Sequence, residues 1–200
     1  MYAFEYQRAA SVADAAAMLA ANPEAKLLAG GQTYIPTLKA RLAQPSHLVD
    51  IARIKELSGI DVKGGVVSIG AMTRHAEVAE SAAVKKAIPA LAALAIEIGD
   101  LQVRNRGTLG GSVANNDPAA DYPAAVLALG ATVVTNKREI AADDFFRACL
   151  PPPWATARSS CASIFLCQNA RRIPNSIIRR QAMRWRVRSW LTQRAACAWR

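Results

Sequence analysis

Cysteine is absent from the first 146 residues of this chain, and histidine occurs only as His47 and His75. Zinc sites and iron–sulfur clusters in proteins are held mainly by cysteine and histidine side chains. The four cysteines all follow residue 146 and have no C-x-x-C spacing. The first 146 residues therefore exclude a cysteine-held iron–sulfur cluster, and we predict no metal ligand. They also offer no residue that we assign as a catalytic acid or base.

Acidic residues, lysine and glycine are missing from the last 54 residues, 147–200, which we call the Arg-rich tail. The tail holds 11 of the chain's 25 basic residues, all of them arginine, and all four tryptophans. The first 146 residues carry 14 basic and 15 acidic residues, so their net charge is −1, whereas the whole chain has +10. The positive charge of the chain is therefore a property of the tail.

Two interpretations account for the composition of the Arg-rich tail. Arginine and tryptophan together favour nucleic-acid binding, through phosphate contacts and stacking on bases. GC-rich DNA translated out of frame also yields arginine, alanine, proline, serine, cysteine and tryptophan and loses acids. We favour the second interpretation, because glycine and every acid disappear together and no sustained helix or strand period is present. We expect residues 147–200 to be out of frame or disordered, to form no packed subdomain, and not to bind nucleic acid.

Long apolar runs are also lacking. No run of about eighteen apolar residues occurs, so a membrane span is not expected. The alanine-rich stretch at 15–21 follows Asp14, and Glu5 stands where a signal peptide would carry positive charge. We therefore expect a cytoplasmic protein.

Helical and extended patterns alternate along the first 146 residues. Ser11 is a suitable N-cap for a helix at 12–21 that stops at Asn22-Pro23. The stretch "KLLAGGQTYIPTLKARLAQP" predicts a strand, a Gly30-Gly31 turn and a helix with a proline in its first turn. Strands are predicted at "HLVDI", "VVSIGA" and 131–135, and helices at "AVKKAIPALAALAIEIG" and in the residues before Gly130. This order indicates an α/β or α+β fold.

A second Gly-Gly pair lies in "RGTLGGSVANNDPAADYPAA", residues 106–125, which we interpret as a polar loop before a helix. Neither pair has the G-K-[S/T] or G-x-G-x-x-G pattern of the P-loop and Rossmann motifs. Each could be a plain turn, or the two could converge on one elongated ligand. Nearby hydroxyl, amide and carboxylate groups favour a nucleotide-type ligand: Thr33, Thr108, Ser112, Asn115, Asn116 and Asp121.

The stretches "LLAGGQTYIPTLKARLAQPSHLVDI" and "RNRGTLGGSVANNDPAADYPAAVLALGATV" resemble the two flavin-binding signatures of the FAD-binding (medium) subunit of molybdenum hydroxylases, of the carbon monoxide and xanthine dehydrogenase type. The resemblance covers residues 1–146. It implies an α+β, two-subdomain FAD-binding domain of the vanillyl-alcohol-oxidase or PCMH-like type, with subdomains at 1–55 and 56–146. The family's C-terminal subdomain would be missing or scrambled in residues 147–200.

The resemblance also implies which residues bind FAD. The first motif would hold the pyrophosphate, and the second would contact the diphosphate and ribityl region. Asp121 would bind a hydroxyl on the adenosine side, and Ile98 would pack near the cofactor. The implied FAD-binding residues are Leu28, Ala29, Gly30, Gly31, Gln32, Thr33, Tyr34, Ile35, Ile98, Thr108, Leu109, Gly110, Gly111, Ser112, Asn115 and Asp121.

In such a complex a molybdopterin large subunit oxidises the substrate, and a small [2Fe–2S] subunit relays electrons to the flavin. The flavin then passes them to NAD, a quinone or oxygen. The resemblance therefore implies an oxidoreductase subunit with FAD as cofactor and these two subunits as partners. A stand-alone flavin reductase of related fold, a nucleic-acid-binding protein and a non-functional truncated product are the alternatives.

Overall fold

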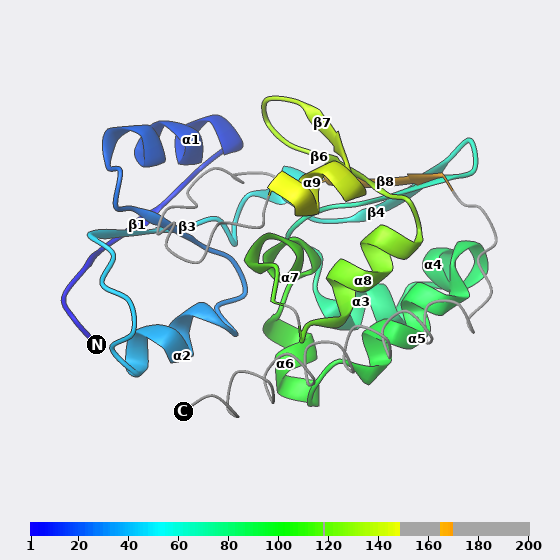
Figure 1. Cartoon of the computed structure of the whole chain (residues 1–200), viewed down its shortest axis with the longest axis horizontal. Coiled ribbons are helices and arrows are strands. Elements are labelled where there is room, and N and C mark those ends of the chain that lie inside the picture. The colour runs from blue at the N-terminus through cyan, green and yellow to red at the C-terminus, as the bar shows by residue number, and fades with distance from the viewer. Residues whose placement is uncertain (118, 149–164, 170–200) are drawn as a thin grey trace, which may run out of the picture.

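The computed structural model describes residues 1–117, 119–148 and 165–169, which form two β-sheets and the helices around them (Figure 1). The smaller sheet has three parallel strands in the order β1-β3-β2. Their bounds are β1 (Glu5–Arg8), β2 (Lys26–Leu28) and β3 (His47–Asp50). In Figure 1, α1 (Val12–Ala21) lies above these strands and α2 (Tyr34–Lys39) below them.

The larger sheet has five strands in the order β4-β5-β8-β6-β7, and all its pairings are antiparallel. Two hairpins form its flanks: β4 (Ile60–Lys63) with β5 (Val66–Ile69), and β6 (Thr132–Val134) with β7 (Glu139–Ala141). The strand β8 (Phe165–Asn169) pairs with β5 on one side and β6 on the other. The two hairpins thus become one sheet through β8.

The strand β8 lies within the Arg-rich tail, which we expected to be out of frame or disordered. Residues 165–169 instead form the central strand of the larger sheet. A strand of five residues is too short to establish a sustained period, so a search for one misses it. The expectations for 149–164 and 170–200 lie outside the described residues.

Most of the helices lie together beneath the larger sheet (Figure 1). The short 3-10 turn η1 (Lys55–Leu57) leads from the smaller sheet toward β4. The helices that follow are α3 (His75–Glu80), α4 (Ala82–Ala87), α5 (Pro89–Glu97), α6 (Leu101–Arg106), α7 (Leu109–Asn115), α8 (Asp121–Ala128) and α9 (Ala142–Ala148). None of the helices in these described ranges combines the length and apolar character needed to cross a membrane.

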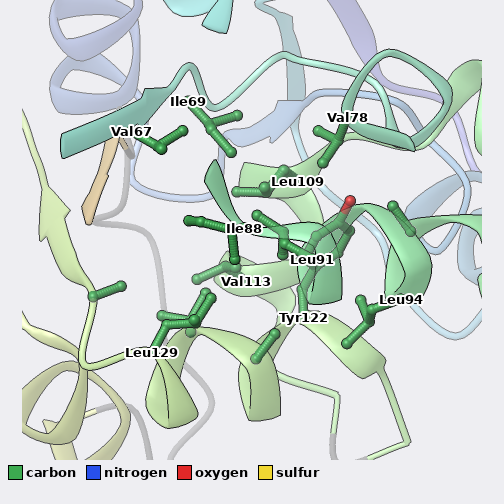
Figure 2. Close-up of a cluster of buried hydrophobic side chains, with 14 of the residues drawn as sticks. Val67, Ile69, Val78, Ile88, Leu91, Leu94, Leu109, Val113, Tyr122 and Leu129 are labelled. Atoms are coloured by element: carbon green, nitrogen blue, oxygen red, sulfur yellow. The ribbon is translucent and has the colours of Figure 1, made fainter. Parts of the chain in front are cut away.

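Buried apolar side chains form two clusters. The larger one gathers residues from β5, β6, α3, α4, α5, α7, α8 and α9 (Figure 2). Tyr122 lies within it and is fully buried. The smaller cluster joins α1 and β3 to Leu57 and Met72. Since Met72 follows β5, the smaller cluster extends past residue 55, and the subdomain boundary there stays a prediction.

Several elements match the sequence expectations. The helix α1 has the bounds expected, and the hydroxyl of its N-cap, Ser11, accepts a hydrogen bond of 3.1 Å from the backbone N–H of Asp14. The strands β2, β3, β5 and β6 and the helices α2 and α8 lie where the pattern predicts them. The stretch "AVKKAIPALAALAIEIG" forms two helices, α4 and α5, with a proline as the first residue of α5. These agreements confirm a fold of mixed helix and strand.

Candidate functional site

The first glycine segment, residues 28–35, leads from the carboxyl end of β2 into α2. Gly31 has a φ of +75°, and its carbonyl accepts a hydrogen bond from Ile35 N–H at 3.0 Å. A Cβ on Gly31 would lie 2.6 Å from Cδ1 of Ile35. The backbone conformation therefore favours glycine at this position, whereas the terminal methyl group of Ile35 could move aside.

Some backbone N–H groups at the start of α2 are available for a ligand. The first N–H groups of a helix have no carbonyl partner within that helix, but here Ile35 N–H donates to the Gly31 carbonyl and Pro36 has no N–H, which leaves those of Gln32, Thr33 and Tyr34. Within the described structure, the Thr33 side chain makes no capping hydrogen bond to these groups. Gln32 and Thr33 are exposed, while Tyr34 and Ile35 are half-buried. The segment thus brings several backbone donors to an accessible surface.

The second glycine segment, residues 106–112, is not the polar loop that the sequence suggested. Gly110 and Gly111 lie in the first turn of α7, and Thr108 is its N-cap. The Thr108 hydroxyl accepts a hydrogen bond of 3.2 Å from Gly111 N–H. Tertiary packing offsets the low helix propensity of adjacent glycines, because Leu109 and Val113 are buried in the larger cluster.

Leu109 and Gly110 have structural partners for their backbone N–H groups. Leu109 N–H donates to the Thr73 carbonyl at 3.0 Å, and Gly110 N–H to the Ala71 carbonyl at 2.9 Å. A Cβ on Gly110 would lie 2.5 Å from the Ala71 Cβ. These two residues therefore fasten the start of α7 to the chain that follows β5. Gly111 and Ser112 remain partly accessible.

The two glycine segments meet at a contact that we call the glycine junction. A Cβ on Gly30 would lie 2.2 Å from the Arg106 carbonyl oxygen and 2.9 Å from the Gly107 Cα. A Cβ on Gly111 would lie 3.6 Å from the Ala29 Cβ. Segments about eighty residues apart in sequence are thus in direct contact.

The other expected site residues lie in different surroundings. Asp121 is the first residue of α8 and is half-buried, and Asn115 is the exposed last residue of α7. Ile98 caps the C-terminus of α5 and packs against the larger cluster. The Arg104 guanidinium donates to the Ile98 and Gly99 carbonyls, both at 3.1 Å. These contacts connect Ile98 to the core and to α6.

His75 and Tyr122 lie next to the site but were not predicted from the sequence. Both are buried, with ring centroids 5.1 Å apart. Burial lowers the pKa of His75 to about 4 and raises that of Tyr122 above its usual range. A single histidine with no neighbouring metal-ligand pattern carries no sequence signal for this arrangement. Among the described residues no group of three or more histidine, cysteine, aspartate or glutamate side chains could hold a metal ion.

Comparison with known proteins gives the family. Residues 2–152 match the FAD binding domain in molybdopterin dehydrogenase. The chain is 46% identical over 148 residues to the carbon monoxide dehydrogenase medium chain of Hydrogenophaga pseudoflava, covering 72% of this chain and 52% of that one. It is 40% identical over 148 residues to the glyceraldehyde dehydrogenase medium chain of Sulfolobus acidocaldarius, covering 72% and 53%. The chain thus spans about half the length of these relatives.

The solved structures give the same result. The carbon monoxide dehydrogenase from Hydrogenophaga pseudoflava that lacks the Mo-pyranopterin moiety of its cofactor superposes with a TM-score of 0.78 at 40% identity. The superposition covers 86% of this chain and 60% of that chain. Both glycine segments fall within the residues matched by the family model. The chain therefore belongs to the family of FAD-binding domains found in molybdopterin dehydrogenases.

Proposed function

We propose that this chain is the FAD-binding part of a cytoplasmic electron-transfer subunit of a molybdenum hydroxylase complex. Its partners are a small [2Fe–2S] subunit, which delivers electrons, and a large molybdopterin subunit, which oxidises the substrate. The external acceptor is NAD, a quinone or oxygen. Names of the relatives support this assignment, since they are medium chains of dehydrogenases. The glycine junction is the observation in the chain itself that supports it best.

The glycine junction fits an extended dinucleotide cofactor. At Gly30 the backbones are so close that a single methyl group would separate them. This contact places the accessible N–H groups of the first segment beside the second segment, where several donors could meet the charge of one diphosphate at once. Gln32 and Thr33 leave the first segment open to solvent beside this contact. A diphosphate could therefore reach both segments together.

Each site residue has a distinct role in the proposal. Backbone N–H groups of residues 31–34 bind the diphosphate. From the second segment, the Ser112 hydroxyl and the backbone of Gly111 also contact it. Asn115 and Asp121 hydrogen-bond to sugar hydroxyls. Leu28, Ala29, Ile35, Thr108, Leu109 and Gly110 shape the two segments, since they pack or cap within them. Ile98 supports the core next to α6.

FAD, when bound, supplies the redox chemistry of the subunit. The chain's own part is to bind the cofactor, orient it and limit its contact with water. We further propose that the two sheets correspond to the two subdomains of a PCMH-like flavin domain. In this proposal the Arg-rich tail does not supply the family's C-terminal subdomain, so FAD binds more weakly than in a longer relative. The absence of acids from the tail supports this, because unpaired guanidinium groups are costly to bury.

Substitution of Gly30 tests the proposal. The full chain is titrated with FAD, and quenching of flavin fluorescence gives the dissociation constant. Gly30→Ala must push the Arg106 carbonyl away, so we expect the dissociation constant to rise by at least about tenfold, a loss of about 1.4 kcal/mol.

Gly130→Ala is the matched control. Gly130 has a φ of +58°, but a Cβ there meets nothing within 4 Å. This variant should lose stability by about 1 kcal/mol, because alanine is strained at positive φ, and should bind FAD like the unchanged chain. Equal FAD affinity in the Gly30→Ala variant and the unchanged chain would refute the proposed site.

A further inference from the structure

His75 lies directly behind the glycine junction. Its backbone N–H donates to the Gly107 carbonyl at 3.1 Å. A Cβ on Gly107 would lie 2.5 Å from Nε2 and 2.8 Å from Cδ2 of the imidazole. Gly107 is therefore enclosed by two neighbours, with Gly30 on one side and the His75 ring on the other. Nothing larger than glycine fits between them without displacement.

Tyr122 supports the His75 ring from α8. The two rings are tilted by 35° with their centroids 5.1 Å apart, which is a normal packing distance for aromatic side chains. Tyr122 is fully buried and follows Asp121 directly in the first turn of α8. Figure 2 shows Tyr122 among the labelled side chains of the larger cluster. The His75 ring thus connects this cluster to the glycine junction.

We propose that His75 is a positioning residue for FAD: its ring holds Gly107, and with it the second glycine segment, against Gly30. This inference rests on the proposed function, since it concerns the same cofactor site. Through Tyr122 the same ring also fixes the start of α8, where Asp121 lies. His75 therefore acts on the site through the backbone of Gly107 and the ring of Tyr122.

The chemistry of the imidazole agrees with a neutral, space-filling role. Nδ1 of His75 and the Tyr122 hydroxyl are buried, and neither has a hydrogen-bond partner among the described residues. A protonated imidazole would need acceptors for both ring nitrogens. Burial also holds the pKa of His75 at about 4, so the ring is uncharged at neutral pH. The contact with Gly107 is made by Nε2 and Cδ2, which a glutamine side chain can imitate with its amide group.

The experiment compares three variants of the full chain: His75→Ala, His75→Gln and Val84→Ala. FAD affinity is measured by fluorescence quenching, and the unfolding midpoint is measured without FAD. His75→Ala should raise the dissociation constant by about tenfold, because Gly107 loses the packing of the imidazole and keeps only the backbone hydrogen bond from residue 75. His75→Gln should restore affinity to within about threefold of the unchanged chain. Val84→Ala removes buried volume from α4 and should lower the unfolding midpoint without changing FAD affinity.

The outcomes separate this inference from the proposed function. Absence of FAD binding by the unchanged chain would contradict the proposed function itself. Normal FAD binding by both the unchanged chain and His75→Ala would overturn the positioning role alone. Equal weakening of FAD binding by Val84→Ala and His75→Ala would also overturn the positioning role, because loss of buried volume alone would then explain the effect. If His75→Ala fails to fold, Gly107→Ala tests the same contact with the ring retained, and unchanged affinity in that variant would overturn the inference.

Discussion

Steric contacts of single glycines determine how closely each glycine segment approaches its neighbours. Gly30 lies against the Arg106 carbonyl, and Gly110 lies against Ala71. Neither position has a positive φ, so closeness of neighbouring atoms, and not backbone conformation, demands glycine there. Gly31 is different, because its φ of +75° disfavours other residues as well. Two physical reasons for glycine therefore operate within one motif.

The buried imidazole of His75 predicts an acid-sensitive contribution to stability. Its pKa is about 4 in the folded chain and about 6.5 when unfolded. As pH falls, His75 is therefore protonated in the unfolded chain at a higher pH than in the folded chain. The stability that neutral His75 contributes to the folded chain is present above pH 6.5 and is lost as pH falls toward 4. The free energy of unfolding falls by at most about 1.4 kcal/mol per pH unit from this one group.

Denaturant unfolding of the unchanged chain and of His75→Gln at several pH values measures this contribution. Carboxyl groups titrate in both proteins, so the difference between the two stability curves isolates His75. We expect the difference in unfolding free energy to shift in favour of His75→Gln as pH falls from 6.5 to 4. A difference that is constant with pH would show that His75 is not buried in its neutral form.

At the scale of elements, α7 is the unit that positions the second segment. It is short, contains two glycines, and is held by the Thr108 cap and by hydrogen bonds to the Thr73 and Ala71 carbonyls. Thr73 is held in turn, because its hydroxyl bonds to the backbone of Gly59. The chain after β5 thus forms a fixed support for α7. The start of this helix depends on tertiary contacts more than on its own sequence.

Thr108→Ala tests the importance of the α7 cap. Loss of the hydroxyl leaves Gly111 N–H without its partner, so we expect a destabilisation of about 1 kcal/mol and weaker FAD binding. Ser11→Ala removes the equivalent cap from α1, away from the glycine junction, and should cost similar stability with unchanged FAD affinity. Thermal unfolding and FAD titration of both variants give the comparison. Unchanged FAD affinity in Thr108→Ala would mean that this cap does not order the site.

At the scale of the whole molecule, β8 decides whether the larger sheet is continuous. Both β5 and β6 pair with it, so each would otherwise present an unpaired edge. The larger cluster lies against this sheet through Val67, Ile69 and Val133. A segment of the Arg-rich tail therefore takes part in the architecture that carries α7 and α8.

Hydrogen exchange of the full chain tests the placement of β8. Amides of residues 165–169 should exchange much more slowly than unstructured peptide, because a central strand has its N–H groups bonded to both neighbours. The amides of Gly64 and Gly65, at the tip of the β4–β5 hairpin, provide a rapidly exchanging reference in the same sample. Exchange of 165–169 as fast as at that tip would contradict the central position of this strand.

Local patterns in the sequence were sufficient to predict part of the secondary structure. Ser11 and Asn22-Pro23 bound α1, and the apolar runs of β3 and β5 are strong strand signals, because capping and side-chain periodicity act within a few residues. The two Gly-Gly pairs, with the residues around them, also identified the family. These features depend on neighbours in the chain and can be recognised without the structure.

The tertiary structure determined features that no short sequence pattern encodes. The second Gly-Gly pair is helical because Leu109 and Val113 are buried, and residues 165–169 form a strand because β5 and β6 lie on either side. His75 gained its place beside Gly107 and Tyr122 only when α3, α6 and α8 packed together. The sequence by itself determined the family and the two glycine motifs. Packing between distant residues determined their contact at Gly30, because backbone atoms 76 positions apart meet there only in the folded chain.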